Sequence, residues 1–131
     1  MSGGKVGGDN VTFIYVLHNE SRGSCKIGKA NNPETRARNL QTGNEDTLSL
    51  AFTLGVDPRI ASKVERKARE IAVYDLKKPK TREWLGRTNP EEAKECILVA
   101  HDIVRGQNWE QVSRARIRMK VLYTRDDEAD Y

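Results

Sequence analysis

Hydrophobic and polar residues are arranged along this chain in a pattern that predicts three strands. Residues 11–18 (VTFIYVLH) form a nearly unbroken β-branched and aromatic run, which is typical of a central strand covered on both faces. A polar segment that ends in Gly23 separates this run from a shorter strand candidate at residues 24–29 (SCKIGK), so the two predict a hairpin. In residues 48–56 (LSLAFTLGV) alternate positions are apolar, which predicts a strand with one buried face.

The length of the hairpin loop decides which side chains share a face of the sheet. A four-residue loop at residues 19–22 pairs His18 with Gly23 and places Tyr15 directly opposite Lys26, on the same face. A five-residue loop places Tyr15 and Lys26 on opposite faces. The sequence leaves both registers open.

Three proline motifs mark the starts of helices. Asn-Pro at 32–33 and 89–90 and Asp-Pro at 57–58 each combine a capping side chain with a proline whose missing N–H is not needed in the first helical turn. Glycines at 43 and 106 are natural stops for the first and third helices. The predicted helices cover residues 33–41, 58–74 and 90–105, so the order is ββαβα followed by a helical C-terminal part.

Length and composition predict one small α/β (α+β) domain. A chain of 131 residues buries about two-thirds of its unfolded surface, which is enough to fold without disulfides or a structural metal. With two cysteines, no apolar run of membrane-spanning length and no leader-like start, the sequence predicts a reducing, cytoplasmic compartment and no membrane partner. The domain is expected at residues 11–105, after a glycine-rich, disordered segment at residues 1–10.

Charge is distributed unevenly along the chain. The net charge is +4, but the last eleven residues carry −3, so the first 120 residues carry +7. A basic body suits an anionic polymer such as DNA, because each neutralised phosphate releases condensed counterions. Within residues 106–125 a fourth helix is predicted from about Asn108, whose Arg114 and Arg118 either grip the DNA backbone or form a solvated polar face. The acidic tail at residues 126–131 either keeps the chain soluble or screens the basic face.

A set of short motifs carries the candidate chemistry. Phe13-Ile14-Tyr15, then Lys26-Ile27-Gly28, and later Arg36 and Glu65 resemble the two-part signature of the GIY-YIG nuclease superfamily. The resemblance runs from about Phe13 to Leu85. Its blocks VTFIYVL, KIGK, PETRARNLQTG, VERKA and REWL look like the compact branch common in phages, in which KIG replaces YIG.

The resemblance implies a fold and a set of roles. The fold would be a small mixed three-stranded sheet flanked by helices. Tyr15 would help to deprotonate the attacking water, Arg36 would clamp the scissile phosphate, Glu65 would hold one Mg²⁺ or Mn²⁺, and Lys26 would replace the second tyrosine. A tyrosine with an ordinary pKa near 10 is a poor base at neutral pH, so cations such as Lys26 and the metal are expected to stabilise the phenolate.

Helical geometry places the same residues at borders between core and solvent. Arg36 lies beside Leu40 at the edge of the apolar stripe of its helix, whereas Arg38 points well away. Glu65 lies just beyond the apolar face of the next helix. Arg38, together with Lys29 of the hairpin, is a further basic candidate for substrate contacts.

Each of these residues also has an ordinary structural interpretation. Glu65 and Arg69 have the i,i+4 spacing of a surface ion pair. Arg36 is long enough to lie over Leu40, and a strand tyrosine is commonly a half-buried core residue. Their joint order and spacing, rather than any one of them, favours a site.

Two other kinds of site are disfavoured. Residues 23–30 (GSCKIGKA) fit a phosphate-binding loop except at Ala30, where Ser or Thr would bind Mg²⁺, and the following helix begins too late. Cys25, Cys96, His18 and His101 lack metal-ligand spacing, so the cysteines are interpreted as core residues.

The sequence therefore predicts a metal-dependent DNA endonuclease of GIY-YIG type. The alternatives are a catalytically degenerate domain that binds nucleic acid without cleaving it, and a protein-interaction module on the same scaffold. Glu83 has no assigned role. The sequence does not decide whether the substrate is DNA or RNA, or whether one strand or both strands are cut. It also does not decide the oligomeric state.

Overall fold

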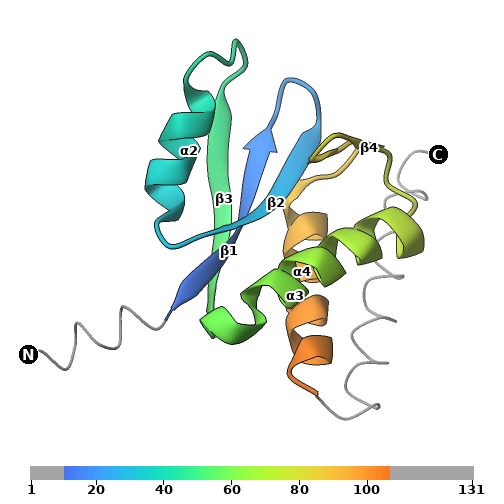
Figure 1. Ribbon diagram of the computed structural model, residues 1–131. Helices are drawn as coiled ribbons and strands as arrows, with labels where there is room; N and C mark the ends of the chain where they lie inside the picture. Colours follow the sequence, from blue (N-terminus) through green and yellow to red (C-terminus); the bar gives the residue numbers. More distant parts are fainter. Residues whose placement is uncertain (1–10, 107–131) are drawn as a thin grey trace, which may run out of the picture.

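The computed structural model describes residues 11–106, in which five strands form one antiparallel sheet of order β3-β1-β2-β5-β4 (Figure 1). The strands are β1 (Thr12–Asn19), β2 (Ser24–Ala30), β3 (Leu48–Val56), β4 (Lys80–Thr81) and β5 (Trp84–Leu85). The helices are α2 (Pro33–Gln41), α3 (Pro58–Glu70), which continues into the π-helical turn η1 (Ile71–Asp75), and α4 (Pro90–Val104). No helix in this part of the chain is long and apolar enough to cross a bilayer.

These elements confirm the predicted α+β class, the three main strands and the three helices. The expectation of a mixed sheet is wrong, because every hydrogen-bonded pair of strands is antiparallel. Strands β2 and β3 do run in the same direction, joined through α2, but β1 lies between them. The sequence also gave no sign of β4 and β5, because two residues are too few to show a period. The predictions for residues 1–10 and 107–131, including the fourth helix and the acidic tail, lie outside the described residues.

The register of the β1–β2 hairpin is neither of the two that the sequence left open. Four residues, 20–23, connect the strands, and Tyr15 pairs with Gly28 while Lys26 pairs with Leu17. The direct pairing of Tyr15 with Lys26, which a four-residue loop at residues 19–22 would produce, is therefore not formed. The two side chains still lie on one face, as that alternative predicts, because its register differs from the observed one by two residues and so preserves the alternation of faces.

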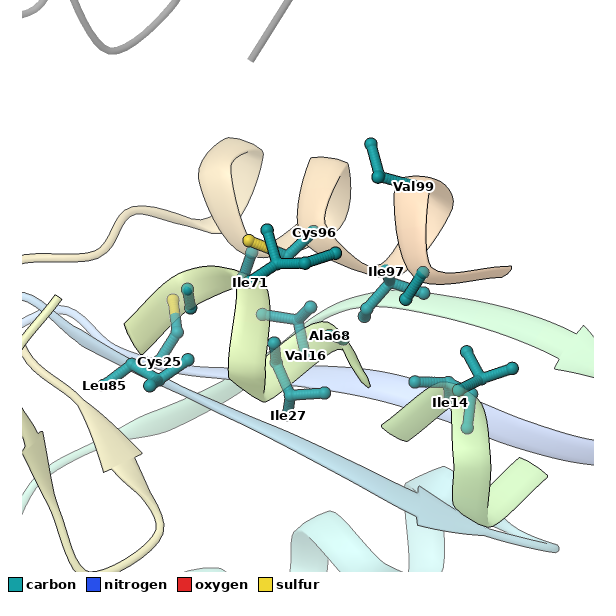
Figure 2. Close-up of a cluster of buried hydrophobic side chains, with 14 of the residues drawn as sticks. Ile14, Val16, Cys25, Ile27, Ala68, Ile71, Leu85, Cys96, Ile97 and Val99 are labelled. Carbon is teal, nitrogen blue, oxygen red and sulfur yellow. The ribbon is translucent and has the colours of Figure 1, made fainter. Parts of the chain in front are cut away.

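Helices α3 and α4 cover one face of the sheet and bury the main core there. Ile14, Val16, Cys25 and Ile27 of the sheet point towards these helices. Figure 2 shows them meeting Ala68 and Ile71 of the α3–η1 segment and Cys96 and Ile97 of α4. Tyr15, Leu17 and Lys26 alternate with these residues and so lie on the other face.

Strand β3 contributes to both faces because its pairing with β1 shifts at one point. Phe52 pairs with Val16 on the helix-covered face, whereas Leu50 pairs with Leu17 on the face of Tyr15. The shift between these pairs is a β-bulge or similar irregularity. Because of it, the apolar side chains of β3 before and after the shift lie on opposite faces of the sheet. The expected single buried face of this strand is therefore divided in two.

The predicted helix caps are all formed. The side chains of Asn32 and Asp57 accept hydrogen bonds from backbone N–H groups in the first turns of α2 and α3, at 3.1 and 2.9 Å. Asn89 and Glu92 form a reciprocal capping box at the start of α4. Proline follows each cap, as the sequence predicts.

A buried ion pair fixes the segment that carries β4 and β5. Lys78 Nζ lies 2.8 Å from Glu92 Oε2 of α4 and also donates a hydrogen bond of 2.8 Å to the Arg87 carbonyl. Both side chains are only 9% exposed. The pair thereby ties both ends of the β4–β5 hairpin to the start of α4.

Replacing Lys78 with alanine is expected to destabilise the fold by about 3 kcal/mol, because it leaves the Glu92 carboxylate buried without this charge partner. Urea denaturation followed by circular dichroism measures the change. Lys63→Ala, at an exposed position of α3, is the matched control and should change the free energy of unfolding by less than about 0.5 kcal/mol. Equal effects of the two substitutions would contradict the structural role of the pair.

Candidate active site

The ring of Tyr15 lies directly over Gly28, its partner across the β1–β2 pair. A Cβ atom added to Gly28 would stand 2.5 Å from both Cζ and the hydroxyl oxygen of Tyr15. Tyr15 is only 1% exposed. The glycine of the Lys-Ile-Gly motif is therefore required here by close approach of an aromatic ring, a use of glycine that strands show where another group comes near the backbone.

Three charged side chains from different elements act on the Tyr15 hydroxyl. Burial raises the pKa of Tyr15 above its ordinary value, and the Arg36 guanidinium of α2, through a hydrogen bond and its charge, opposes that rise. The carboxylates of Glu65 on α3 and Glu83 in the β4–β5 turn raise the pKa further. Tyr15 is therefore a neutral phenol at neutral pH, next to one cation and two anions.

Lys26 is held by Glu83, the residue to which the sequence assigned no role. Lys26 Nζ lies 2.8 Å from Glu83 Oε1; the lysine side chain is 5% exposed and the glutamate side chain 67%. Lys26 also pairs with Trp84 across β2 and β5, which brings the β4–β5 turn over the lysine. The Lys26 ammonium lowers the pKa of Glu83, so this carboxylate is ionised.

The signal for Glu83 was present in the sequence, since it lies in the REWL block of the family resemblance. What the sequence lacked was the pairing of β2 with β5, through which Glu83 reaches Lys26. The expected cation beside the Tyr15 phenol was Lys26, but Arg36 is the cation that acts on the pKa of Tyr15.

Arg69 connects the site to the edge of the sheet. Strand β5 pairs with β2 only at Cys25 and Lys26. At the next residue of β2, the Ile27 carbonyl accepts a hydrogen bond of 3.1 Å from Arg69 Nη1. The same guanidinium lies 3.4 Å from Glu65 Oε2. The helical ion pair considered from the sequence is therefore real, and it also fastens the part of α3 that carries Glu65 to β2.

The structure brings together Tyr15, Lys26, Arg36 and Glu65, although they come from four separate places in the chain. The substrate-binding candidates lie elsewhere. Lys29 pairs with Ile14 and so alternates to the opposite face of the sheet.

Arg38 lies on the exposed side of α2, where it donates a hydrogen bond of 3.2 Å to Thr35 Oγ1. Arg114 and Arg118 fall outside the described residues. The contribution of these basic residues to substrate binding stays a prediction.

The cysteines are core residues, as expected. Cys25 and Cys96 are free and fully buried, and Cys25 Sγ donates a hydrogen bond of 3.3 Å to the Thr88 carbonyl. Burial raises the pKa of both thiols to about 12. Between residues 11 and 106 no three His, Cys, Asp or Glu side chains are grouped to hold a metal ion by themselves.

A buried tyrosine and a buried lysine lie on one face of the antiparallel sheet, and the charges of Arg36, Glu65 and Glu83 act on that tyrosine. Such a group of polar side chains is typical of a catalytic or anion-binding centre. Residues 12–101 match the family model of the T5orf172 domain, and the chain belongs to this phage-associated domain family, which is often found in nuclease contexts. Comparison with curated proteins and with solved structures gave no match.

Gly28→Ala is expected to destabilise the fold by about 1–3 kcal/mol, because the new methyl group overlaps the Tyr15 ring and forces it to move. The matched test is the same substitution in a Tyr15→Ala background, where the ring is absent. We expect most of the cost of Gly28→Ala to vanish there, measured as the coupling energy of a double-mutant cycle from denaturant unfolding. An equal cost in both backgrounds would show that the ring does not lie against Gly28.

Proposed function

We propose that the protein is a metal-dependent DNA endonuclease of GIY-YIG type. The observation that carries the proposal is that Arg36, Glu65 and Glu83, from three different elements, all act electrostatically on the Tyr15 hydroxyl, while Lys26 is held by Glu83. Membership of the T5orf172 family is compatible with a nuclease and with DNA binding. The basic charge of the body of the chain supports a polyanionic substrate.

Tyr15 supplies the proton acceptor in this proposal. In the free protein its raised pKa keeps the phenol protonated, so it must lose its proton before it can accept one from water. Arg36 is the group that favours this loss, because its hydrogen bond and charge lower the pKa of Tyr15. The guanidinium is exposed at the site and offers a planar fork that matches the oxygens of a phosphate.

The carboxylate of Glu65 is chemically suited to a hard divalent ion. Magnesium is commonly bound by one or two carboxylates together with waters and substrate phosphates, so the absence of a larger ligand cluster in residues 11–106 is compatible with such a site. When bound, Mg²⁺ or Mn²⁺ would supply charge that stabilises the leaving oxygen. The guanidinium of Arg69 lies 3.4 Å from the Glu65 carboxylate, and the charge of Glu65 acts on the Tyr15 phenol.

The Lys26–Glu83 pair supports the second candidate function, a domain that binds nucleic acid without cleaving it. With Glu83 as its partner, Lys26 is committed to an ion pair rather than to the phenol of Tyr15. Arg36 would then bind a phosphate while Tyr15 stays protonated. The two candidate functions differ in whether the phosphodiester bond of the nucleic acid is hydrolysed.

Conversion of supercoiled plasmid to nicked or linear DNA in Mg²⁺ or Mn²⁺ tests the proposal. Tyr15→Phe and Glu65→Gln are each expected to lower the cleavage rate by about a hundredfold or more, the usual contribution of a general acid–base group or a metal ligand. Tyr74→Phe and Glu70→Gln are the matched controls, because Tyr74 is 70% exposed and Glu70 lies five residues after Glu65, at the end of α3. Both controls should retain the wild-type rate.

Cleavage that persists in both test variants would overturn the assigned chemistry. An intact plasmid in either metal, with a salt-dependent shift of DNA mobility on a gel, would favour the binding domain. No affinity for DNA at low salt would exclude both candidates.

The cleavage rate is also expected to rise with pH. Below its raised pKa, the phenolate fraction of Tyr15 increases tenfold per pH unit, whereas Glu83 is already ionised at neutral pH. Initial rates between pH 6.5 and 8.5 should therefore increase with a slope near one in log units. Any residual activity of Tyr15→Phe should lack this slope. A wild-type rate that falls over this range would contradict the role of Tyr15 as a base.

A further inference from the structure

A pocket lies beside the candidate active site, between the β1–β2 hairpin and the β4–β5 hairpin. Its volume of about 400 Å³ is within the range of small-molecule sites, about 300–1,000 Å³. Trp84, Arg82, Asp46, Asn19 and Ser24 are among the residues that line it. The lining thus combines an aromatic ring with groups that donate and accept hydrogen bonds.

The pocket is on the same face of the sheet as Tyr15 and Lys26. Asn19 lies four positions after Tyr15 in β1, and it pairs with Ser24, which lies two positions before Lys26 in β2. Trp84 pairs with Lys26 and directly follows Glu83, the ion-pair partner of that lysine. The pocket therefore opens on the face of the sheet at which a substrate phosphate would meet Lys26.

The polar wall of the pocket is fixed by a network of hydrogen bonds. Asp46 Oδ2 accepts hydrogen bonds from Asn19 Nδ2 at 3.0 Å and from Arg22 Nε at 2.7 Å. These two donors lower the pKa of Asp46, so the carboxylate is ionised. Asn19 is only 4% exposed, and its Oδ1 accepts a hydrogen bond from the Arg22 backbone.

Some hydrogen-bonding groups of the wall are left for a ligand. Asp46 Oδ1 and the hydroxyl of Ser24, a residue that is 7% exposed, have no hydrogen-bond partner among the described residues. A ligand with N–H groups on its edge would satisfy the free carboxylate oxygen.

The turn that closes the other side of the pocket keeps a strained residue. Arg82 is the first residue of the two-residue turn between β4 and β5, and its φ is +57°, a value that glycine adopts without cost. An arginine occupies this position, and it lines the pocket. Strain of this kind is held where the surrounding structure or a function requires the residue.

We propose that this pocket binds an unpaired nucleobase of a nucleic-acid strand whose phosphate lies at the Tyr15–Arg36 site. The Trp84 ring offers a stacking surface for the base, and Asp46 offers a fixed acceptor for its N–H groups. Arg22 and Arg82 neutralise the adjacent backbone. The inference rests on the proposed nucleic-acid function, and it makes the substrate a strand with at least one base out of the duplex.

The test uses the fluorescence of Trp84 in the full chain. The sequence has two tryptophans, so Trp109→Phe leaves Trp84 as the only one. This protein is titrated, in EDTA to prevent cleavage, with a short single-stranded oligonucleotide and with versions that carry an abasic nucleotide at each position in turn. The intact oligonucleotide should quench Trp84 emission. One abasic position should abolish the quenching and weaken binding roughly five- to hundredfold, the range for loss of one stacked base.

Trp84→Leu connects this loss to the pocket. This variant should bind the intact oligonucleotide as weakly as the Trp109→Phe protein binds the oligonucleotide whose abasic position abolishes quenching. Its affinity should not fall further when that base is removed. Trp84→Phe, which keeps an aromatic face, should retain most of the affinity. If Trp84→Leu does not fold, the quenching data from the parent chain still decide the question.

Three results would overturn the inference in distinguishable ways. Salt-dependent binding that is unchanged by an abasic nucleotide at every position would show that the pocket holds no base and leave the proposed function intact. An equal loss for intact and abasic strands in Trp84→Leu would assign the pocket to backbone phosphate instead. No binding of any oligonucleotide at low salt would remove both the inference and the proposed function.

Discussion

The position of Tyr15 over Gly28 is the constraint on which the rest of the site depends. Side chains alternate between the faces of a strand, so a shift of the β1–β2 pairing by one residue would send Tyr15 and Lys26 to opposite faces. A shift by two residues would keep the faces but place a side chain where the Tyr15 ring now lies. Only a pairing that puts a glycine opposite Tyr15 keeps Tyr15 and Lys26 on one face and also leaves room for the Tyr15 ring. The four-residue connection at residues 20–23 provides it.

Those parts of the fold that have a local signal were predicted from the sequence. The β-branched run of β1, the three cap-and-proline motifs and the apolar alternation of β3 each specify an element through its own residues. What the sequence did not specify depends on contacts between distant segments. The two short strands exist because β5 pairs with two residues of β2, and because the buried Lys78–Glu92 pair fixes the segment around them. The bulge in β3 is likewise a property of its pairing with β1.

The same distinction holds for the site. Arg36 and Glu65 could be placed at the borders of apolar helix faces by helical periodicity alone, and the family resemblance joined them to Tyr15. Glu83 has no periodic signal, since it lies in a turn, and its partner Lys26 is reached only through the pairing of β5. Arg69 was considered only as an ion-pair partner, yet its bond to the Ile27 carbonyl requires an uncovered edge of β2. The role of a residue that contacts a different helix or strand cannot be predicted from the residue pattern of its own element.

Two lysine–glutamate pairs of the same length, 2.8 Å, illustrate why burial, rather than distance, decides what an ion pair does. In the Lys78–Glu92 pair both charges are withdrawn from water, so separating them leaves two poorly solvated ions, and the pair acts as a fixed structural link. In the Lys26–Glu83 pair only the lysine is buried, and the glutamate side chain is 67% exposed.

Glu83 can leave Lys26 and regain its hydration at little cost, but Lys26 then needs another anion. Under the proposed function, a phosphate of the substrate is that anion. The exchange would bring the phosphate next to Arg36, the group whose hydrogen bond and charge lower the pKa of Tyr15. Substrate binding and release of Glu83 would then be coupled through the buried ammonium of Lys26.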